Sequence, residues 1–386
     1  MQVTLPLAPA LIAMTGLQAL VATALFTPGV LAPKLVLSDN DIGAFATAVF
    51  ATGAATSLYG GLLSSRFGPF TIAAFCALGV ALSMMTAALA SLPALIVAGL
   101  LLGLAFGPET PASSALLSRL ARTDQRPLIF SVRQTGNQIG AMAGSVTLPL
   151  IAMTSPISGF GFIILLAIAA GLIFLTLRTR YDPVGRGKGE RLDIKATLKL
   201  VAGERRLLRL AIASMPFSAM QMALNTFFVA HAVHGLALSH VTAGLLLAAA
   251  QAGGLVGRLT WGLVAVHIGS AHAVIVALGG TMSGFAMLLA LVRPDWPVFL
   301  LAVVATFLGL TASGWNGVFL AEVARLAPSG SVAEATGAVL MASYTGLLIG
   351  PSLVAGLAAV GTLSLSYAGL AGLTMVATLT LIGARR

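Results

Sequence analysis

One acidic side chain lies deep in a long apolar segment, where it could carry a proton across a membrane. Glu109, in the run Gly107-Pro108-Glu109-Thr110-Pro111, is the only acid near the middle of any apolar segment. It lies about 15 Å of helix from Arg119, where that segment ends. A carboxylate at this depth is costly unless it is protonated, paired or facing water. Glu109 is therefore the candidate for proton coupling, with a hydrogen bond between two helices as the structural alternative.

Four polar residues form one stripe on the apolar segment that directly follows the one with Glu109. They are Arg133, Gln134, Asn137 and Gln138, and their spacing places them on one face of a helix. Such a stripe facing lipid would be prohibitively costly, so it predicts a polar cavity. Through its planar set of donors, Arg133 could reach Glu109 or an anionic substrate. The alternative for Arg133 is an extended side chain that reaches the lipid headgroups.

Amide and aromatic side chains occur at a similar depth in other segments. Together with one cation and one titratable acid, they suit a small amphiphilic organic solute such as a carboxylate. Each of these residues, taken singly, could instead make a hydrogen bond between packed helices. The predicted substrate-binding residues are Arg133, Gln134, Asn137, Gln138, Gln18, Gln221, Asn225, Gln251, Trp315, Asn316 and Tyr344.

Twelve apolar segments long enough to cross a bilayer position these side chains. Hydrophobic residues make up 58% of the chain and charged residues 8%, which leaves too few polar residues for a water-soluble surface. Continuous apolar runs without alternation predict helices, because backbone polar groups in lipid must be satisfied within the segment. The expected fold is an all-α membrane protein. Its spans are about 8–32, 42–64, 70–90, 93–118, 127–152, 157–177, 208–231, 241–265, 270–292, 296–321, 333–358 and 362–383.

A single charged segment from Arg178 to Arg209 divides the apolar segments six and six. The chain is therefore expected to form two six-helix bundles, 1–177 and 208–386, joined by a linker at 178–207. Most Lys and Arg lie in this linker and in the loops on its side of the membrane. By the positive-inside rule the linker and both termini are cytoplasmic, in a multi-pass protein of the cytoplasmic (inner) membrane. Contact of this basic rim with the lipid bilayer accounts for the net charge of +10, so no nucleic-acid partner is expected.

The two halves of the chain repeat one another. A shift of 201 residues aligns Gly53 with Gly254, and a shift of 206 aligns Gly103 with Gly309 and Arg119 with Arg325. Matching glycines and arginines in the same order predict a duplicated architecture. A parallel repeat of six plus six helices places a shared cavity between the halves near mid-membrane.

The loop at 61–68 carries a motif, Gly61-Leu62-Leu63-Ser64-Ser65-Arg66-Phe67-Gly68. It resembles the Gly-x-Leu-x-Asp-Arg-x-Gly-x-Arg/Lys signature of the major facilitator superfamily. Ser65 stands where the family usually has Asp, and Phe70 stands where it usually has Arg or Lys. The resemblance implies secondary transport by alternating access, as a symporter or antiporter, with Gly61, Arg66 and Gly68 at the gate.

Small-residue faces on the fifth and eleventh spans add to this expectation. Gly136, Gly140 and Gly144 are spaced four residues apart, as are Gly346 and Gly350, so each set permits close approach of another helix. The resemblance implies that these spans help to close the two halves outside the cytoplasm. Gly140, Gly144, Gly346 and Gly350 are therefore predicted gating residues, with ordinary tight packing as the alternative.

Other classes of function find little support. The chain has no P-loop, no Gly-rich dinucleotide motif and no paired intramembrane acids, so neither an enzyme nor a cofactor is expected. The expected partners are protons and a small-molecule substrate, and the expected form is a monomer. Three alternatives remain open: an exporter of amphiphilic drugs, a non-transporting membrane sensor, and a copper importer. The copper site would use His231, His234, Met215, Met220 and Met222.

Overall fold

The chain is described by a computed structural model at residues 5–35, 37–153, 155–182 and 193–383. All regular secondary structure in these residues is helical, which confirms the all-α class. The first half contains α1 (Leu7–Leu35), α2 (Asp39–Phe67), α3 (Pro69–Ala87), α4 (Leu92–Leu120), α5 (Arg126–Ile151) and α6 (Pro156–Tyr181). The second half contains α8 (Arg205–Ala230) with the π-helical turn η1 (His231–Gly235), α9 (His240–Ile268), α10 (Ala271–Leu291), α11 (Val298–Ala312), α12 (Asn316–Leu326), α13 (Val332–Val360) and α14 (Leu363–Ile382).

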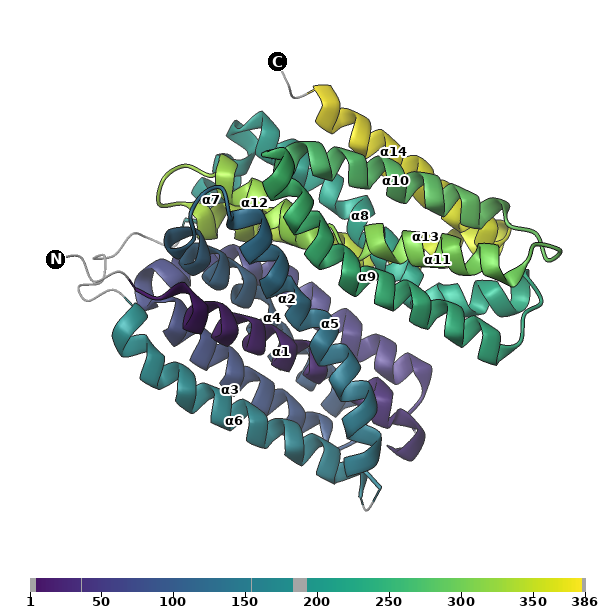
Figure 1. Cartoon of the computed structure of the whole chain (residues 1–386). Helices are drawn as coiled ribbons and strands as arrows, with labels where there is room; N and C mark the ends of the chain where they lie inside the picture. The colour runs from purple at the N-terminus through teal and green to yellow at the C-terminus, as the bar shows by residue number, and fades with distance from the viewer. Residues whose placement is uncertain (1–4, 36, 154, 183–192, 384–386) are drawn as a thin grey trace.

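These helices form two bundles that lie side by side (Figure 1). The purple-to-teal helices α1–α6 make one bundle, and the teal-to-yellow helices α8–α14 make the other. The ends of α1 and α14 that carry the two termini lie on the same side of the molecule as the short helix α7 (Ile194–Gly203). We call this side the terminal face, and the side that carries the loop at 152–155 the distal face.

Two details differ from the expected twelve uninterrupted spans. The tenth span is broken at residues 313–315, which separate α11 from α12, and the linker contains α7. Eleven described helical segments satisfy the length and hydropathy required of a span, and α5 is not among them. The polar stripe that begins at Arg133 lowers the mean hydropathy of α5. The helix nevertheless packs against the neighbouring spans α1 and α9.

Helix starts are set by short polar side chains. Ser38 and Asp41 form a reciprocal cap at the start of α2, with Ser38 N–H donating to the Asp41 carboxylate at 2.9 Å. Asp182, just after α6, caps α3 by accepting hydrogen bonds from the Phe70 and Thr71 amides, both at 2.9 Å. Each such cap stabilises its helix by about 1 kcal/mol.

Gly68, in the loop that resembles the family signature, meets two structural demands. Its φ of +89° lies in the region that favours glycine, and an added Cβ would lie 2.6 Å from the Asp182 Cβ. The loop can therefore turn from α2 into α3 only with glycine here. Arg66, in the last turn of α2, places its guanidinium 5.4 Å from the centre of the Phe67 ring.

The internal repeat is visible in the helix contacts. An added Cβ on Gly103 of α4 would lie 2.8 Å from the Val49 carbonyl oxygen of α2. The equivalent Gly309 of α11 is tight against Ala250 of α9, and Ala250 is Val49 shifted by 201 residues. The same contact thus recurs in the second bundle, as the predicted duplication requires.

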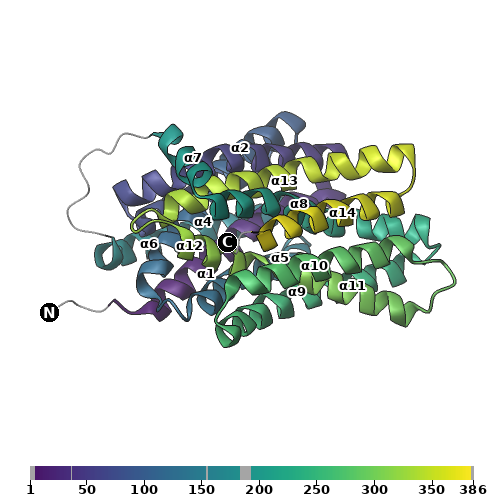
Figure 2. The ribbon, with the colours of Figure 1, turned by 90° about the horizontal axis from the view of Figure 1, so that it is seen from above.

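The two bundles touch along the half of the molecule nearer the terminal face, where α13 runs beside α2 (Figure 2). The Ser57 hydroxyl donates to the Gly337 carbonyl at 3.0 Å. An added Cβ on Gly61 would lie 2.7 Å from the Ala333 carbonyl carbon, and one on Gly317 would lie 2.7 Å from the Ser131 amide nitrogen. Glycines at these positions let the bundles meet backbone to backbone. The structure is therefore closed on the terminal face.

The glycine faces of the fifth and eleventh spans do not meet in this structure, which is open on the distal face. Gly140 packs against Ala19 of α1, and Gly346 packs against Met215 of α8. Gly144 and Gly350 likewise face Thr23 of α1 and Ala219 of α8, within their own bundles. Spacing shows that a helix face can be approached closely, but it does not identify the neighbour. The contacts between bundles are made instead by Gly61, Gly337, Gly262 and Gly317.

Candidate functional site

A narrow cavity of about 80 Å³ lies between the bundles, beyond the contacts that close the terminal face. Both bundles contribute polar side chains to its wall, among an apolar minority that includes Phe106 and Leu347. The polar and aromatic residues lining it are Gln18, Phe106, Glu109, Thr110, Gln134, Asn137, Ser218, Gln221, Arg258, Asn316, Ser343 and Tyr344.

Glu109 and Arg133 form a buried ion pair at this cavity. An Arg133 Nη2 hydrogen contacts the Glu109 carboxylate, and the same nitrogen donates to the Thr110 hydroxyl at 3.1 Å. Thr110 in turn donates to the second Glu109 oxygen at 2.9 Å. Arg133 is only 1% exposed, so its side chain does not reach toward the lipid headgroups. The contact between α4 and α5 brings together the acid and the cation that the sequence predicted to lie within reach of one another.

A second buried arginine faces the same cavity and was not among the predicted site residues. Arg258 of α9 is 1% exposed, and its Nη1 donates to the Gln134 carbonyl oxygen at 2.8 Å. Its Nε and Nη2 are buried without a hydrogen-bond partner in the part of the chain that the structure describes. The signal in the sequence is the charge itself, since an arginine inside a span is costly wherever it faces lipid. The sequence does not show that it faces the other bundle.

The described charges of the cavity do not balance. Glu109 supplies one carboxylate, whereas Arg133 and Arg258 supply two guanidinium groups. Besides the free donors of Arg258, the Nε and Nη1 of Arg133 are also buried without a partner among the described atoms. Buried cationic donors without partners are unfavourable by about 1–3 kcal/mol each or more. An anion that entered the cavity would satisfy both the charge and the donors.

Amide side chains line the rest of the site in hydrogen-bonded sets. Gln18 of α1 donates to Gln134 of α5 at 2.5 Å, and Asn316 of α12 donates to Gln221 of α8 at 3.2 Å. The Gln18 carbonyl oxygen is buried without a partner among the described residues, which leaves an acceptor at the cavity wall.

Gln138, Gln251 and Asn225 form a chain of amides that joins the two bundles. Gln138 of α5 donates to Gln251 of α9 at 3.0 Å, and Gln251 donates to Asn225 of α8 at 2.8 Å. Only Asn225 of these three lines a cavity, the outer one described below. Gln138 and Gln251 line neither cavity, so their predicted role in substrate binding has no support from the cavity lining.

Trp315, which the sequence placed in the substrate site, does not line the cavity in this structure. Its ring is 1% exposed and packs edge-on against Phe217, at 5.5 Å between centroids, and Phe319, at 4.9 Å. The break between α11 and α12 rotates this position toward the core of the second bundle. Tyr344 does line the cavity, and its ring lies 4.8 Å from that of Phe106.

A second cavity of about 240 Å³ continues from the first toward the distal face. The two share Phe106, Asn137, Gln221 and Leu347. The outer cavity reaches Gly29, near the distal end of α1, and the exposed Asn225 and Thr226 of α8. Access to the buried charges therefore comes from the distal face.

The residues of the copper alternative are dispersed. His231 packs against the Tyr367 ring at 5.3 Å between centroids, and Met220 lies in the hydrophobic core. Within the described ranges, no three His, Cys, Asp or Glu side chains are placed together as metal ligands.

Comparisons with known proteins agree with this architecture. Residues 10–351 match the family model described as Major Facilitator Superfamily. The solved fucose:proton symporter of E. coli has 14% identity and a TM-score of 0.79, covering 98% of this chain and 99% of its own. The human organic anion transporter MFSD10 has 16% identity and a TM-score of 0.76, with 98% and 100% covered. A bacterial homologue of the iron transporter ferroportin, in an outward-facing state, has 13% identity and a TM-score of 0.76, with 98% and 99% covered. A search of curated proteins gives no match.

Proposed function

Because this chain belongs to the major facilitator superfamily, we propose that it is a secondary transporter that couples a proton to a small organic anion, most simply a monocarboxylate. Family membership and the multi-pass helical architecture support a membrane transporter. The charges at the cavity supply the rest of the proposal.

The observation that carries the substrate class is the pair of unpartnered donors on Arg258. The Nε and Nη2 atoms lie on adjacent corners of the guanidinium plane, which is the arrangement that binds both oxygens of one carboxylate. Across the cavity, Gln18 and Asn316 offer amides to other polar groups of the solute, and Phe106 and Tyr344 offer aromatic surface. A small carboxylate with a short polar or aromatic body matches this lining.

The coupling step follows from competition for Arg133. With the cavity empty, Glu109 is held as a carboxylate by Arg133 and Thr110. A substrate carboxylate that reaches Arg133 weakens this pair, and a buried carboxylate without its cation favours protonation. A proton taken from the distal-face water would then sit on Glu109 while the anion is bound. Proton and anion cross together because each stabilises the other in the cavity.

Charge accounting supports a one-to-one ratio. The empty site carries one positive charge in excess, from two guanidinium groups and one carboxylate. Adding one proton and one monoanion leaves that excess unchanged. The bundles can therefore change conformation with equal charge in the empty and loaded states, which avoids moving additional buried charge through a low-dielectric environment.

Membrane placement is part of the proposal. The basic terminal face is cytoplasmic by the positive-inside rule, in the cytoplasmic membrane of a cell that keeps a proton gradient across it. The structure closed on the terminal face is then the outward-facing state. We infer a monomer, since both bundles needed for the cavity belong to one chain.

Export of anionic amphiphiles by the same site is the second candidate. The adjacent rings of Phe106 and Tyr344 and the mainly apolar walls of the outer cavity favour it, because they offer contacts to a larger apolar body. Tight binding of long-chain or polyaromatic anions, with no binding of short carboxylates, would select this candidate.

The experiment is a paired screen of carboxylates and their amides. Purified protein is first assayed for thermal stabilisation by each compound, since a ligand that binds the native state raises the melting temperature. Vesicles that contain the protein and a luminal pH dye then receive each carboxylate or its uncharged amide. We expect stabilisation and luminal acidification with a subset of carboxylates, and neither with their amides. Stabilisation by amides and carboxylates alike would refute the anion assignment.

A further inference from the structure

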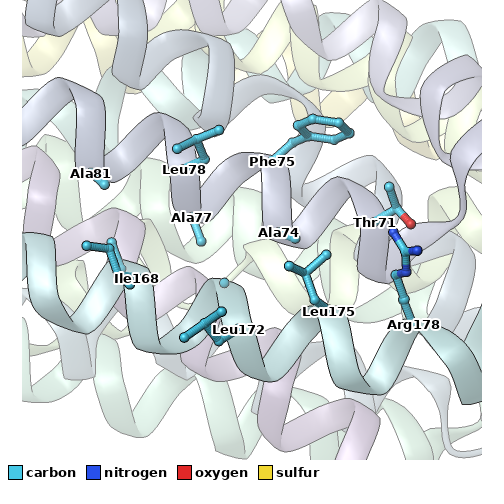
Figure 3. A pocket seen from close by; sticks show the side chains of 12 residues that line it. Thr71, Ala74, Phe75, Ala77, Leu78, Ala81, Ile168, Leu172, Leu175 and Arg178 are labelled. Carbon is cyan, nitrogen blue, oxygen red and sulfur yellow. The ribbon is translucent and has the colours of Figure 1, made fainter.

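The outer surface of the first bundle carries an apolar groove of about 310 Å³ between α3 and α6 (Figure 3). Small residues form its floor, which include Ala74, Ala77 and Gly171. Gly171 approaches α3 closely, since an added Cβ would lie 3.6 Å from the Ala77 Cβ. The larger side chains of Phe75, Leu78, Ile168, Leu172 and Leu175 stand along its edges.

These edge residues face the membrane. Phe75 and Leu172 are each 60% exposed, on helices with the length and hydropathy of membrane spans. The groove extends from Thr71 to Ala81 on α3, which is about 15 Å of helix. That is half of the roughly 30 Å hydrocarbon thickness, or one lipid leaflet. A groove of this depth and length accommodates one acyl chain that enters from the terminal face.

A positive charge stands at the terminal-face end of the groove. Arg178 of α6 lines the groove there, and its side chain is directed toward Thr71 of α3 (Figure 3). Arg178 is exposed, and its side chain has no ion pair or hydrogen bond among the described residues. Both oxygens of the nearby Asp182 carboxylate accept hydrogen bonds at the start of α3, and no ion pair joins it to Arg178 among the described residues.

We propose that this groove binds an anionic phospholipid of the terminal-face leaflet, with one acyl chain between α3 and α6 and the headgroup phosphate on Arg178. The two parts of the site match the two parts of the ligand, and both lie at the depth that a lipid of that leaflet imposes. Basic side chains at this level attract the anionic lipids that accumulate in a cytoplasmic leaflet.

The same bundle contains a groove that serves as an internal comparison. It has a volume of about 600 Å³, lies between α1, α5 and α6, and is lined by residues such as Ile12, Ile139 and Leu177. No charged residue lines it. It can hold an acyl chain but offers nothing to select a headgroup.

Native mass spectrometry of the purified full-length protein tests this site. The probes are dioleoyl phosphatidylglycerol and dioleoyl phosphatidylcholine, which have the same chains and differ in headgroup charge. We expect the first bound lipid to favour phosphatidylglycerol by about fivefold, the ratio for one basic side chain at an anionic surface. Arg178→Gln should remove this preference, whereas Arg293→Gln, an equally simple change at an exposed arginine on the distal face, should keep it.

Gly171→Phe tests the groove itself, since a ring there occupies the space of the acyl chain. It should reduce the first binding event for both lipids while the protein remains monomeric. Equal binding of the two lipids by the native protein, or a preference that survives Arg178→Gln, would overturn the proposal. Dimer peaks that disappear in Gly171→Phe without lipid adducts would instead assign this face to a second copy of the chain.

Discussion

Replacing Arg258 by glutamine should weaken anion binding and stabilise the ligand-free protein, two effects of opposite sign. The glutamine amide can still donate to the Gln134 carbonyl, which accepts from Arg258 Nη1 at 2.8 Å. The substitution removes the buried positive charge and the two donors, Nε and Nη2, that have no partner among the described residues. A structural arginine would behave differently, because its loss would destabilise the fold.

The magnitudes follow from the lost contacts. A hydrogen bond to a charged group contributes about 1.5–3 kcal/mol, so the dissociation constant of a bound carboxylate should rise about 10- to 100-fold. Removing unsatisfied buried donors should raise the free energy of unfolding of the ligand-free protein by about 1 kcal/mol or more. The uncharged amide of the same compound should bind Arg258→Gln and the native protein equally weakly.

The assay combines calorimetric titration of a carboxylate identified in the paired screen with thermal unfolding in its absence. Arg293→Gln is the matched control, because that arginine is exposed on the distal face and should change neither measurement. The reasoning is refuted if Arg258→Gln binds the carboxylate with native affinity. It is equally refuted if the substitution lowers the melting temperature of the ligand-free protein.

Three other predictions concern the gate, the helix packing and the topology. For the gate, Thr226→Cys in a Cys76→Ser background supplies one cysteine for labelling in the outer cavity. Gly337→Leu should reduce its labelling by an impermeant maleimide several-fold, because the leucine side chain blocks closure of the terminal face. Unchanged labelling would contradict this gate. Gly140→Leu should lower the melting temperature through a clash of about 1–3 kcal/mol within the first bundle, and it should leave that labelling unchanged. Altered labelling at native stability would instead support Gly140 as a gating residue, as the sequence predicted. A reporter at the C-terminus should indicate the cytoplasm and one at Ser155 the opposite side; the reverse result would invert the membrane placement.

Much of the architecture could be predicted from the sequence because the signals are local. A run of apolar residues specifies a span whatever lies beside it, and the repeated glycines identify the duplication without any contact being known. The pairing of Glu109 with Arg133 was accessible for a similar reason. Both are charged groups that cannot face lipid, and their depths can be counted along their helices.

The remaining features depend on the rotation of each helix about its axis, which neighbouring helices determine. Arg258 was visible as a charge in a span, but its direction toward the other bundle comes from the close packing of α9 against α5. Trp315 was placed in the cavity by its depth in the tenth span, and the break before α12 turns it into the core. Gly140 faces Ala19 of its own bundle, a neighbour that spacing alone could not identify because a small-residue face fits any close helix.

Coupling through Glu109 is the central claim, and one comparison tests it most directly. Vesicles are prepared with the native protein, with Glu109→Gln, which mimics the protonated acid, and with Glu109→Asp, which retains a titratable group. We expect Glu109→Gln to abolish accumulation of a carboxylate driven by an imposed pH gradient while exchange between preloaded vesicles continues, and Glu109→Asp to retain part of the accumulation. Accumulation by Glu109→Gln at the native level would contradict proton coupling at this residue.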